Sequence, residues 1–362
     1  MTPTDRPVAL IVSLKFHPGH FSHLVANYRL LEEAGFTPVL YLHPRFARMD
    51  ERREFRTVTS PRELEALAPR LAVFWFPNLR NVTEILRLRL RWRTRIVYVF
   101  HEPFETFARY RRRGFSPMRI AKIWLINLVN VAVLALSHEV ILPSGSAWRR
   151  YDEAYSWLGL PASLVPLLFD DEAGQDIPVE VKEYIAYVGT IAPDHAFERF
   201  VAFAQQALAE GWFPGHRFAI ATGSTLAAPT RAMLQPLVES GELVLVDGRP
   251  LTTTEINAFY RTSAIIWNAY HGSMQSGVLP KAFMFGTPVI SRAGNANEYV
   301  TDGVTGVLVH DTADTGALRG AVQRVLDHQA AFTSACRAVF LDTFFYRNYA
   351  RVFDRVAAPY RS

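Results

Sequence analysis

The segment from residue 265 to 309 constrains the fold most, because a strand, a loop, a short helix and a second strand follow one another in it. An apolar strand ends at Asn268, and a loop of small and polar residues follows. Pro280 occupies a first helical position, and a short helix then runs from Lys281 to Phe285 before the second strand. Such a unit belongs to a parallel sheet, with its loop at the carboxyl end of a strand. We therefore expect a phosphate or carboxylate at the start of this helix, where Lys281 adds a positive charge.

The same segment resembles the nucleotide-sugar end of glycosyltransferase family 4, whose GT-B fold has two Rossmann-like domains. The resemblance is carried by GTPVIS and by GNANEYVTDGVTGVLV, with matches at Gly286, Pro288, Glu298, Asp302, Gly303 and Gly306. The family also carries two glutamates eight positions apart. Lys281 stands at the second of these positions and Ser273 at the first, so both acidic groups are absent here.

Length and composition indicate two globular domains of ordinary size. The chain has 362 residues, of which 49% are hydrophobic and 20% are charged. Its single cysteine, Cys336, excludes a disulfide framework and a thiolate metal site, and it is interpreted as a small buried residue in a reducing compartment. The polar N-terminus leads directly into a strand, which leaves no room for a signal peptide. We therefore expect a cytoplasmic protein.

The first half alternates between short apolar runs and helical patterns. The runs are rich in β-branched and aromatic residues without strict alternation, which is typical of strands buried on both faces; they span residues 8–14, 39–42, 71–76, 96–100 and 140–142. Helical patterns lie between them at residues 20–34, 61–67, 81–91 and 117–136. This order predicts a parallel βαβ domain. The first turn lacks GxGxxG, which argues against a dinucleotide site in this half.

Two loops of the first half supply candidate acceptor or cleft residues. The resemblance implies that the first turn borders the cleft and that its glycine, Gly19, lets the substrate come close. His17 and His20 are candidates for contacting phosphate, and a cap or turn role is the alternative for either. His101 and Glu102 follow the strand that ends at residue 100, where parallel sheets bind ligands.

The resemblance implies that His101 lies against the donor sugar or the acceptor. Glu102 is the candidate general base, should the reaction invert configuration. The alternative interpretation of this dipeptide is helix capping or an ion pair between the two side chains.

The chain has a formal net charge of +5, and its arginines are clustered at residues 87–95 and 109–119. The clusters are interpreted either as solvated faces or as contacts to an anionic surface such as phospholipid headgroups. We discount nucleic acid, because no nucleic-acid motif accompanies the arginines.

Residues 123–136 form the most apolar run, but its 14 residues include Asn127 and Asn130, whereas a membrane span needs about 20 apolar residues. The sequence therefore predicts that this run does not cross a bilayer. It is either a buried helix or an interfacial helix that docks the protein on a membrane carrying a lipid-linked acceptor.

The second half repeats the alternation after an acidic, proline-containing linker at residues 170–181. Its first strand, residues 184–188, ends in a turn that resembles the opening of the family's donor domain. The family's diphosphate-binding arginine and lysine are absent from this turn, so His195, Arg199 or Lys281 would have to replace them. A helix from residue 252 to 260 has Thr252, Thr253 or Thr254 as its N-cap.

The resemblance implies that the donor site is assembled from the loops of this half. Its candidate residues are Gly189, Thr190, Gly223, Arg249, Ser276, Gly277, Lys281 and Glu298. Arg249 or Leu251 would lie against the face of a base held by main-chain groups. No cluster of His, Cys or carboxylates has metal-ligand spacing, so we expect a metal-independent reaction without a cofactor, with a UDP- or GDP-sugar as the donor substrate.

These patterns together predict an α/β protein of the GT-B class with two parallel sheets facing a cleft. The N-terminal acceptor-binding domain comprises residues 1–172 and a returning C-terminal helix at 343–362, and the nucleotide-sugar-binding domain comprises residues 173–342. The predicted function is transfer of a hexosyl group to a saccharide acceptor, linked to a polyprenyl diphosphate, in bacterial polysaccharide synthesis. A catalytically inactive nucleotide-sugar-binding subunit and a GT-B-fold epimerase remain alternatives.

Overall fold

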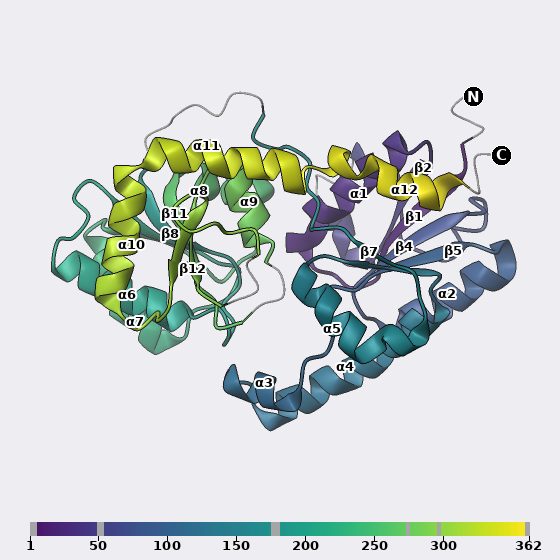
Figure 1. The fold of residues 1–362 in the computed structure, drawn as a ribbon, viewed down its shortest axis with the longest axis horizontal. Helices are drawn as coiled ribbons and strands as arrows, with labels where there is room; N and C mark the ends of the chain where they lie inside the picture. The colour runs from purple at the N-terminus through teal and green to yellow at the C-terminus, as the bar shows by residue number, and fades with distance from the viewer. Residues whose placement is uncertain (1–5, 49–53, 175–181, 273–275, 295–297, 359–362) are drawn as a thin grey trace. The chain divides into compact units, whose positions relative to one another are not determined.

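The computed structural model describes residues 6–48, 54–174, 182–272, 276–294 and 298–358, and its chain divides into two compact units (Figure 1). The N-terminal unit comprises residues 1–170 and 344–362, and the C-terminal unit comprises residues 171–343. The sequence placed the two domain boundaries after residues 172 and 342, so the observed boundaries differ by two residues and by one residue.

The N-terminal unit is built on a seven-stranded parallel sheet with the order β3-β2-β1-β4-β5-β6-β7. The interior strands are almost entirely buried, as their apolar sequences require when helices cover both faces of a sheet. Its strands are β1 (Val8–Ser13), β2 (Thr37–Leu42), β3 (Thr57–Val58), β4 (Leu71–Trp75), β5 (Arg95–Val99), β6 (Glu139–Leu142) and β7 (Ala162–Leu164). Its helices are α1 (Phe21–Glu33), α2 (Leu79–Trp92), α3 (Phe107–Arg112), α4 (Pro117–Leu136), α5 (Gly145–Tyr155) and α12 (Ala350–Ala357).

Local sequence explains where several of these helices begin. The side chain of the residue before each helix accepts a hydrogen bond from a backbone N–H of the first turn, which satisfies a donor that has no partner within the helix. The capping residues are Asn78 for α2, Thr106 for α3, Ser116 for α4 and Ser144 for α5.

The predicted return of the C-terminal helix to the first domain is confirmed. Phe345 pairs with Phe169 in an isolated parallel bridge, and the hydroxyl of Tyr346 donates to Glu33 at 3.0 Å. Figure 1 shows α12 beside α1, which it contacts. This segment therefore completes the N-terminal unit.

The predicted helix at residues 61–67 is wrong, because this stretch forms successive turns. Backbone bonds join residues three apart, such as Leu64 N–H to the Pro61 carbonyl at 3.3 Å. The Glu63 carboxylate accepts from the amide of Ser60 at 2.9 Å, and Ala68 has a left-handed φ of 42°. These contacts end the segment before an α-helical ladder is established.

Helix α4, Pro117–Leu136, has the bounds that the sequence predicted, and much of its surface is exposed. The prediction that it does not cross a bilayer counted only the apolar run from residue 123, whereas the whole helix has 20 residues. Among the described residues, α4 alone is long and apolar enough to cross a membrane by length and composition, so its length does not exclude a span.

The C-terminal unit is built on a six-stranded parallel sheet with the order β10-β9-β8-β11-β12-β13. Its strands are β8 (Tyr184–Val188), β9 (Arg217–Ala221), β10 (Leu243–Val246), β11 (Ser263–Asn268), β12 (Val289–Arg292) and β13 (Gly306–Val309). Its helices are α6 (Phe197–Ala209), α7 (Ala228–Glu239), α8 (Thr253–Thr262), α9 (Val278–Met284), α10 (Thr315–Asp327) and α11 (Gln329–Val339). The two parallel sheets confirm the predicted α/β class.

Two glycines of the resembled motif have steric roles in this unit. A Cβ on Gly306 would lie 2.4 Å from the Val289 carbonyl oxygen, so β12 and β13 pair only if residue 306 has no side chain. Gly286 has a φ of +63°, and its Cβ would lie 2.6 Å from Thr333. Cys336 on α11 is fully buried, as predicted, and its thiol donates to the Thr305 carbonyl at 3.3 Å.

Candidate functional site

The candidate donor site lies at the switch point of the C-terminal sheet, between β8 and β11. The chain runs from β8 outward through β9 to β10 and then returns to place β11 on the other side of β8. The loops after β8 and β11 therefore leave in opposite directions, and α/β sheets bind ligands at the carboxyl edge of such a switch point. Gly189 marks this point with a φ of +139°, and its Cβ would lie 3.5 Å from Val278 and 4.0 Å from the Tyr270 hydroxyl.

A histidine–tyrosine pair lies at this edge of the sheet. The rings of His195 and Tyr270 are stacked, with centroids 4.2 Å apart and planes 10° apart. The carbonyl of Thr190 accepts from the Tyr187 hydroxyl at 2.8 Å and lies 2.5 Å from Nδ1 of His195. The turn after β8 is thus held rigidly against the segment that follows β11, and His195 presents its other ring edge from a partly exposed position.

The segment before α9 adds the Ser276 hydroxyl to the same edge. Ser276 hydrogen-bonds to Tyr270, whose phenol pKa is raised because the ring is buried. Its hydroxyl also accepts from the backbone N–H of Val278 at 3.3 Å. Gly277 is the N-cap of α9, which begins at Val278, so the prediction that Pro280 opens this helix is wrong by two positions.

Lys281 is neither exposed nor at the helix start. Its side chain is 7% exposed, and Nζ donates to Oε2 of Glu172 at 2.6 Å. Burial lowers the pKa of the Lys281 ammonium, and the charge of Glu172 opposes that shift. The alternative of an exposed helix-start lysine is therefore contradicted, and a role in binding phosphate stays a prediction.

Gly223 and Arg249 come together at the neighbouring loops of the sheet. A Cβ on Gly223 would lie 3.6 Å from the Arg249 carbonyl oxygen. The Arg249 guanidinium donates to Glu255 at 3.0 Å, and Glu255 also accepts from the backbone N–H of Thr252 at 2.8 Å. Thr252 is thus the N-cap of α8, within the range predicted, and Arg249 extends this capping box.

The remaining donor-site candidates are less well defined. Glu298 is exposed, and the loop residues 295–297 that precede it lie outside the described residues. Ser273, which stands at the family's first glutamate position, also lies outside them. Arg199 is exposed on the first turn of α6, four residues after His195. The described part of the chain contains no group of three or more His, Cys, Asp or Glu side chains arranged to hold a metal ion.

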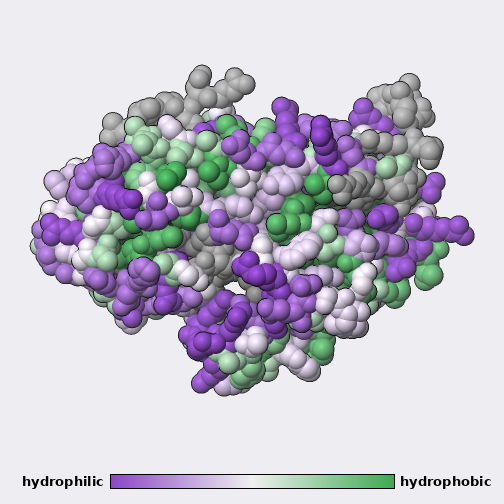
Figure 2. All heavy atoms as spheres, in the orientation of Figure 1, coloured by the Kyte–Doolittle hydropathy of each residue, from purple (hydrophilic) through white to green (hydrophobic). Residues whose placement is uncertain are grey.

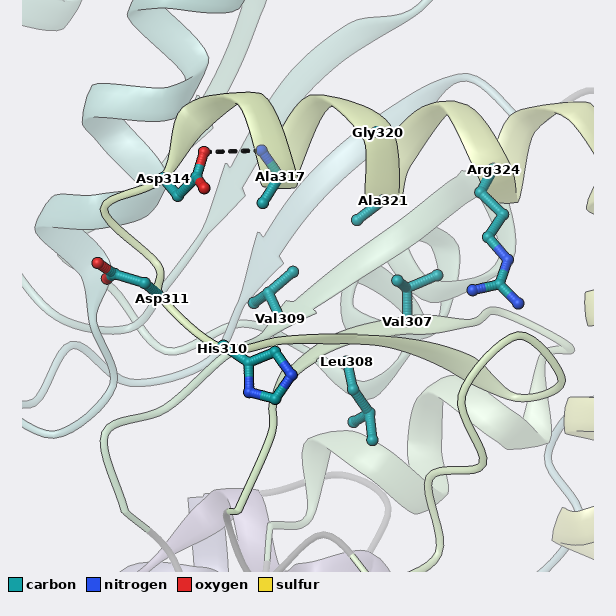
Figure 3. A pocket seen from close by; sticks show the side chains of 10 residues that line it. All are labelled: Val307, Leu308, Val309, His310, Asp311, Asp314, Ala317, Gly320, Ala321 and Arg324. Atoms are coloured by element: carbon teal, nitrogen blue, oxygen red, sulfur yellow. Dashed lines mark hydrogen bonds between the residues drawn. The ribbon is translucent and has the colours of Figure 1, made fainter.

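A groove of about 340 Å³ lies elsewhere on this unit, between β13 and α10 (Figure 3). Figure 3 shows the side chains of Asp311, Asp314 and Arg324 around it, with Asp314 capping α10 through the Ala317 amide at 2.9 Å. Because β13 is the outermost strand, β12 separates this groove from the switch point. None of the predicted donor-site residues lines it.

The candidate acceptor residues gather at the switch point of the N-terminal sheet, between β1 and β4. The His17 and His20 rings have centroids 4.0 Å apart, and His20 lies 4.4 Å from the ring of Phe76 and 5.9 Å from that of His101. His20 is the N-cap of α1 but makes no side-chain cap bond. The sequence therefore placed these histidines together correctly, and capping does not explain His20.

Burial favours the neutral form of His17 and His20. The pKa of His20 lies well below its usual value, first because the ring is buried and then because His17, His23 and His101 surround it. The pKa of His17 is lowered by burial and by Lys15. Within the described structure, Nδ1 of His17 and of His20 is buried without a hydrogen-bond partner, which leaves a polar atom on each ring for a ligand.

Phe76 follows β4 in a strained backbone conformation, with a left-handed φ of 64°. That conformation turns its ring parallel to His101, with centroids 4.9 Å and planes 15° apart. Trp75 lies 4.9 Å from the same imidazole. His101 is thus buried between two aromatic rings at the carboxyl edge of the sheet.

Gly19 and Glu102 are exposed, and a Cβ on Gly19 would meet nothing within 4 Å, so no neighbour in this unit requires a glycine there. The buried carboxylate nearby is Glu105, which forms a salt bridge with Arg113 at 2.9 Å.

Sequence reasoning missed Tyr270, Phe76 and Glu172. Tyr270 lies two residues beyond a predicted strand that ends at the switch point, and this position was the signal that could have identified it. No sequence signal indicated the φ of Phe76, or that Glu172 pairs with a lysine 109 positions away.

Residues 182–328 match the protein family described as Glycosyl transferases group 1. The whole chain is similar in fold to sucrose-phosphate synthase from Thermosynechococcus elongatus, with a TM-score of 0.71, 16% identity, and coverage of 98% of this chain and 99% of that one. It is also similar to HepE from Anabaena in complex with UDP-glucose, with a TM-score of 0.65, 13% identity, and coverage of 97% and 99%. A glycosyltransferase from Rickettsia africae aligns with a TM-score of 0.67, 11% identity, and coverage of 99% and 100%. No curated protein matches the chain by sequence.

These similarities identify the fold class first: the chain has the GT-B fold of glycosyltransferases, as the sequence predicted. The family match is confined to the C-terminal unit, where residues 182–328 span all six strands and the whole candidate donor site. Within that unit, residues 182–328 are similar to the group 1 glycosyl transferases.

Proposed function

We propose that the chain transfers a hexosyl group from a nucleotide sugar to a saccharide acceptor. The observation that carries the proposal is the close approach of Gly189 to Tyr270 and Val278 at the switch point, within the residues that match the family. A side chain at residue 189 would fill the edge where an α/β sheet binds a ligand. HepE is described in complex with UDP-glucose, which supports a UDP-sugar as donor, with a GDP-sugar as the alternative.

The leaving diphosphate must be neutralised as an acceptor oxygen approaches the anomeric carbon. We assign this role to the backbone amides at Thr190 and Gly277 and to the side chains of His195 and Arg199. Lys281 is already paired with Glu172 and would serve the diphosphate only after that pair opens. No metal is part of the proposed mechanism.

The proposed acceptor site is the group of rings around His20, Phe76 and His101. Flat aromatic faces pack against the apolar face of a sugar ring, and the buried Nδ1 atoms of His17 and His20 offer hydrogen bonds to its hydroxyls. Glu102 is exposed beside His101 and is the proposed general base if the reaction inverts configuration. We propose a polyprenyl-diphosphate-linked saccharide as acceptor, used on the cytoplasmic side of a bacterial membrane in polysaccharide synthesis.

Calorimetry with UDP, GDP, ADP and their common sugars tests the donor site. We expect one nucleotide to bind selectively, and His195→Ala to weaken it about tenfold through loss of a charge-assisted hydrogen bond to phosphate. His216→Ala is the matched control, because His216 precedes β9 at the opposite, amino end of the sheet. Absence of binding to every nucleotide would contradict the proposal.

A catalytically inactive nucleotide-sugar-binding subunit is the second candidate. The observation that favours it is Lys281, which is buried and ion-paired at the position where the resembled family has a glutamate. Nucleotide binding without sugar transfer to any saccharide or lipid-linked acceptor would support this candidate. Conversion of the nucleotide sugar in the absence of an acceptor would instead indicate the epimerase that the sequence left open.

A further inference from the structure

Helix α4 exposes an apolar face that is not buried against the rest of the N-terminal unit. Only 22% of its 18-residue apolar window is buried. Met118 is 85% exposed, Leu125 is 58% exposed and Leu128 is 47% exposed. These residues are spaced by seven and three, so they share one side of the helix. Trp124 lies next to them and is also exposed.

The opposite side of α4 is fixed to the N-terminal unit. The Tyr98 hydroxyl on β5 donates to Oδ1 of Asn130 at 2.6 Å, and the Tyr155 hydroxyl donates to Asn127 at 2.5 Å. Ile120 and Leu134 are fully buried on the same side. Crossing a bilayer would break these buried hydrogen bonds, so the helix presents its outer face while it remains on the sheet.

Positive charge lies at the N-terminal end of the apolar face, on α3 and on the first turns of α4. Residues 107–136 contain five arginines and one lysine, and no aspartate or glutamate. Arg111, Arg112, Arg119 and Lys122 are exposed. Figure 2 shows hydrophobic spheres beside a group of hydrophilic ones at the lower edge of the N-terminal unit, where Figure 1 draws α3 and α4.

We propose that the α3–α4 surface, residues 107–128, docks on an anionic lipid bilayer, with α4 lying in the plane of the interface. An apolar face flanked by arginine and lysine is the composition that binds such a surface, and tryptophan favours the boundary between headgroups and acyl chains. A second copy of the chain is a poorer occupant, because a symmetric contact would bring two arginine clusters together. The proposal does not depend on the sugar that the protein transfers.

Flotation of the full chain with lipid vesicles tests this proposal. We expect the protein to float with phosphatidylcholine vesicles that contain phosphatidylglycerol, and to float much less with phosphatidylcholine alone or at high salt. Leu125→Glu combined with Leu128→Glu should reduce the bound fraction about tenfold, because two charges would enter the apolar layer. Both residues are exposed, so the unfolding midpoint of the variant should equal that of the parent chain.

Met233→Glu is the matched control, since Met233 is an exposed apolar residue on α7 of the C-terminal unit, and this variant should float like the parent chain. Equal binding by the parent chain and the α4 variant would overturn the proposal, as would failure of the parent chain to float. A concentration-dependent dimer in ultracentrifugation that the α4 substitutions abolish, without vesicle binding, would assign the face to self-association and equally overturn it.

Discussion

Nζ of Lys281 lies 2.6 Å from Oε2 of Glu172, which joins α9 to the segment that opens the C-terminal unit. The neighbouring Asp171 forms a salt bridge with Arg337 on α11. Asn257 on α8 also donates to the Glu172 carboxylate, at 2.8 Å. The start of the unit is therefore fixed to three of its helices by charged and polar contacts.

Glu172→Gln should destabilise the C-terminal unit by about 2 kcal/mol, because it leaves a buried ammonium without its carboxylate. Adding Lys281→Met should recover most of that loss, since the uncompensated charge is then removed. Urea unfolding of the single and double variants measures both effects. Glu239→Gln, at an exposed site on α7, is the control. If it lowered the free energy of unfolding as much as Glu172→Gln does, the ion pair between Glu172 and Lys281 would contribute nothing specific.

His20 should make the N-terminal unit less stable as the pH falls below 6.5. Its folded-state pKa lies well below that value, so on acidification the unfolded chain binds a proton before the folded chain does. The groups facing it, His17, His23, His101 and Lys15, all act in the same direction. The contribution of His20 to the free energy of unfolding is fully present above pH 6.5. It declines as the pH falls from 6.5 to the folded-state pKa.

Urea unfolding across this pH range should therefore give a flatter profile for His20→Leu than for the parent chain. His310→Leu, which alters an exposed histidine of the other unit, should leave the slope unchanged. Identical slopes for all three proteins would contradict the inference that His20 is neutral when folded.

The backbone strain at Phe76 predicts an unusual order of stability for two small substitutions. Phe76→Gly should be about 1 kcal/mol more stable than Phe76→Ala, because only glycine adopts a left-handed φ without cost. Phe74 on β4 is not in that conformation, so glycine should be the less stable substitution there. Urea unfolding of the four variants provides the comparison, and the same order at both positions would argue against strain.

Arg249 should control the titration of Glu255. The hydrogen bond from Arg249 and the amide of Thr252 lower the pKa of the Glu255 carboxyl to about 2. Its contribution to stability is therefore present above the ordinary value of 4.5 and is lost as the pH falls toward 2. In Arg249→Ala, carboxyl carbon NMR should show this pKa rising, whereas Arg217→Ala should not change it.

Removal of divalent metal should leave nucleotide binding unchanged, because the described residues form no metal-ligand group. Calorimetry before and after EDTA treatment tests this expectation. A loss of binding that Mg²⁺ restores would indicate that the diphosphate is bound as its metal complex.

Local sequence predicted those elements whose signals are local. Apolar runs indicated the buried strands, and the threonines before residue 255 indicated the start of α8, because periodicity and capping act within a few residues. The helix at residues 61–67 was mispredicted because Glu63 bonds to the amides of Thr59 and Ser60, so these residues form turns instead.

The candidate sites were predicted less completely than the fold. His101 and Gly189 were correctly predicted to lie at the carboxyl ends of strands, because a parallel sheet brings these ends to one edge. The stack of Tyr270 on His195 and the pairing of Glu172 with Lys281 join distant segments, and no local pattern encodes those distances. The ring of Phe76 was missed because its orientation depends on a backbone angle that residue type does not reveal.

The buried thiol of Cys336 has a practical consequence for measurements on this protein. Burial raises the pKa of the thiol, and the S–H group donates a hydrogen bond to the Thr305 carbonyl. The thiolate, which is the reactive form, is therefore scarce and enclosed. A maleimide or a thiol-reactive spin label should not react with Cys336 in the native chain. A cysteine introduced at an exposed position can therefore be labelled selectively without first replacing Cys336.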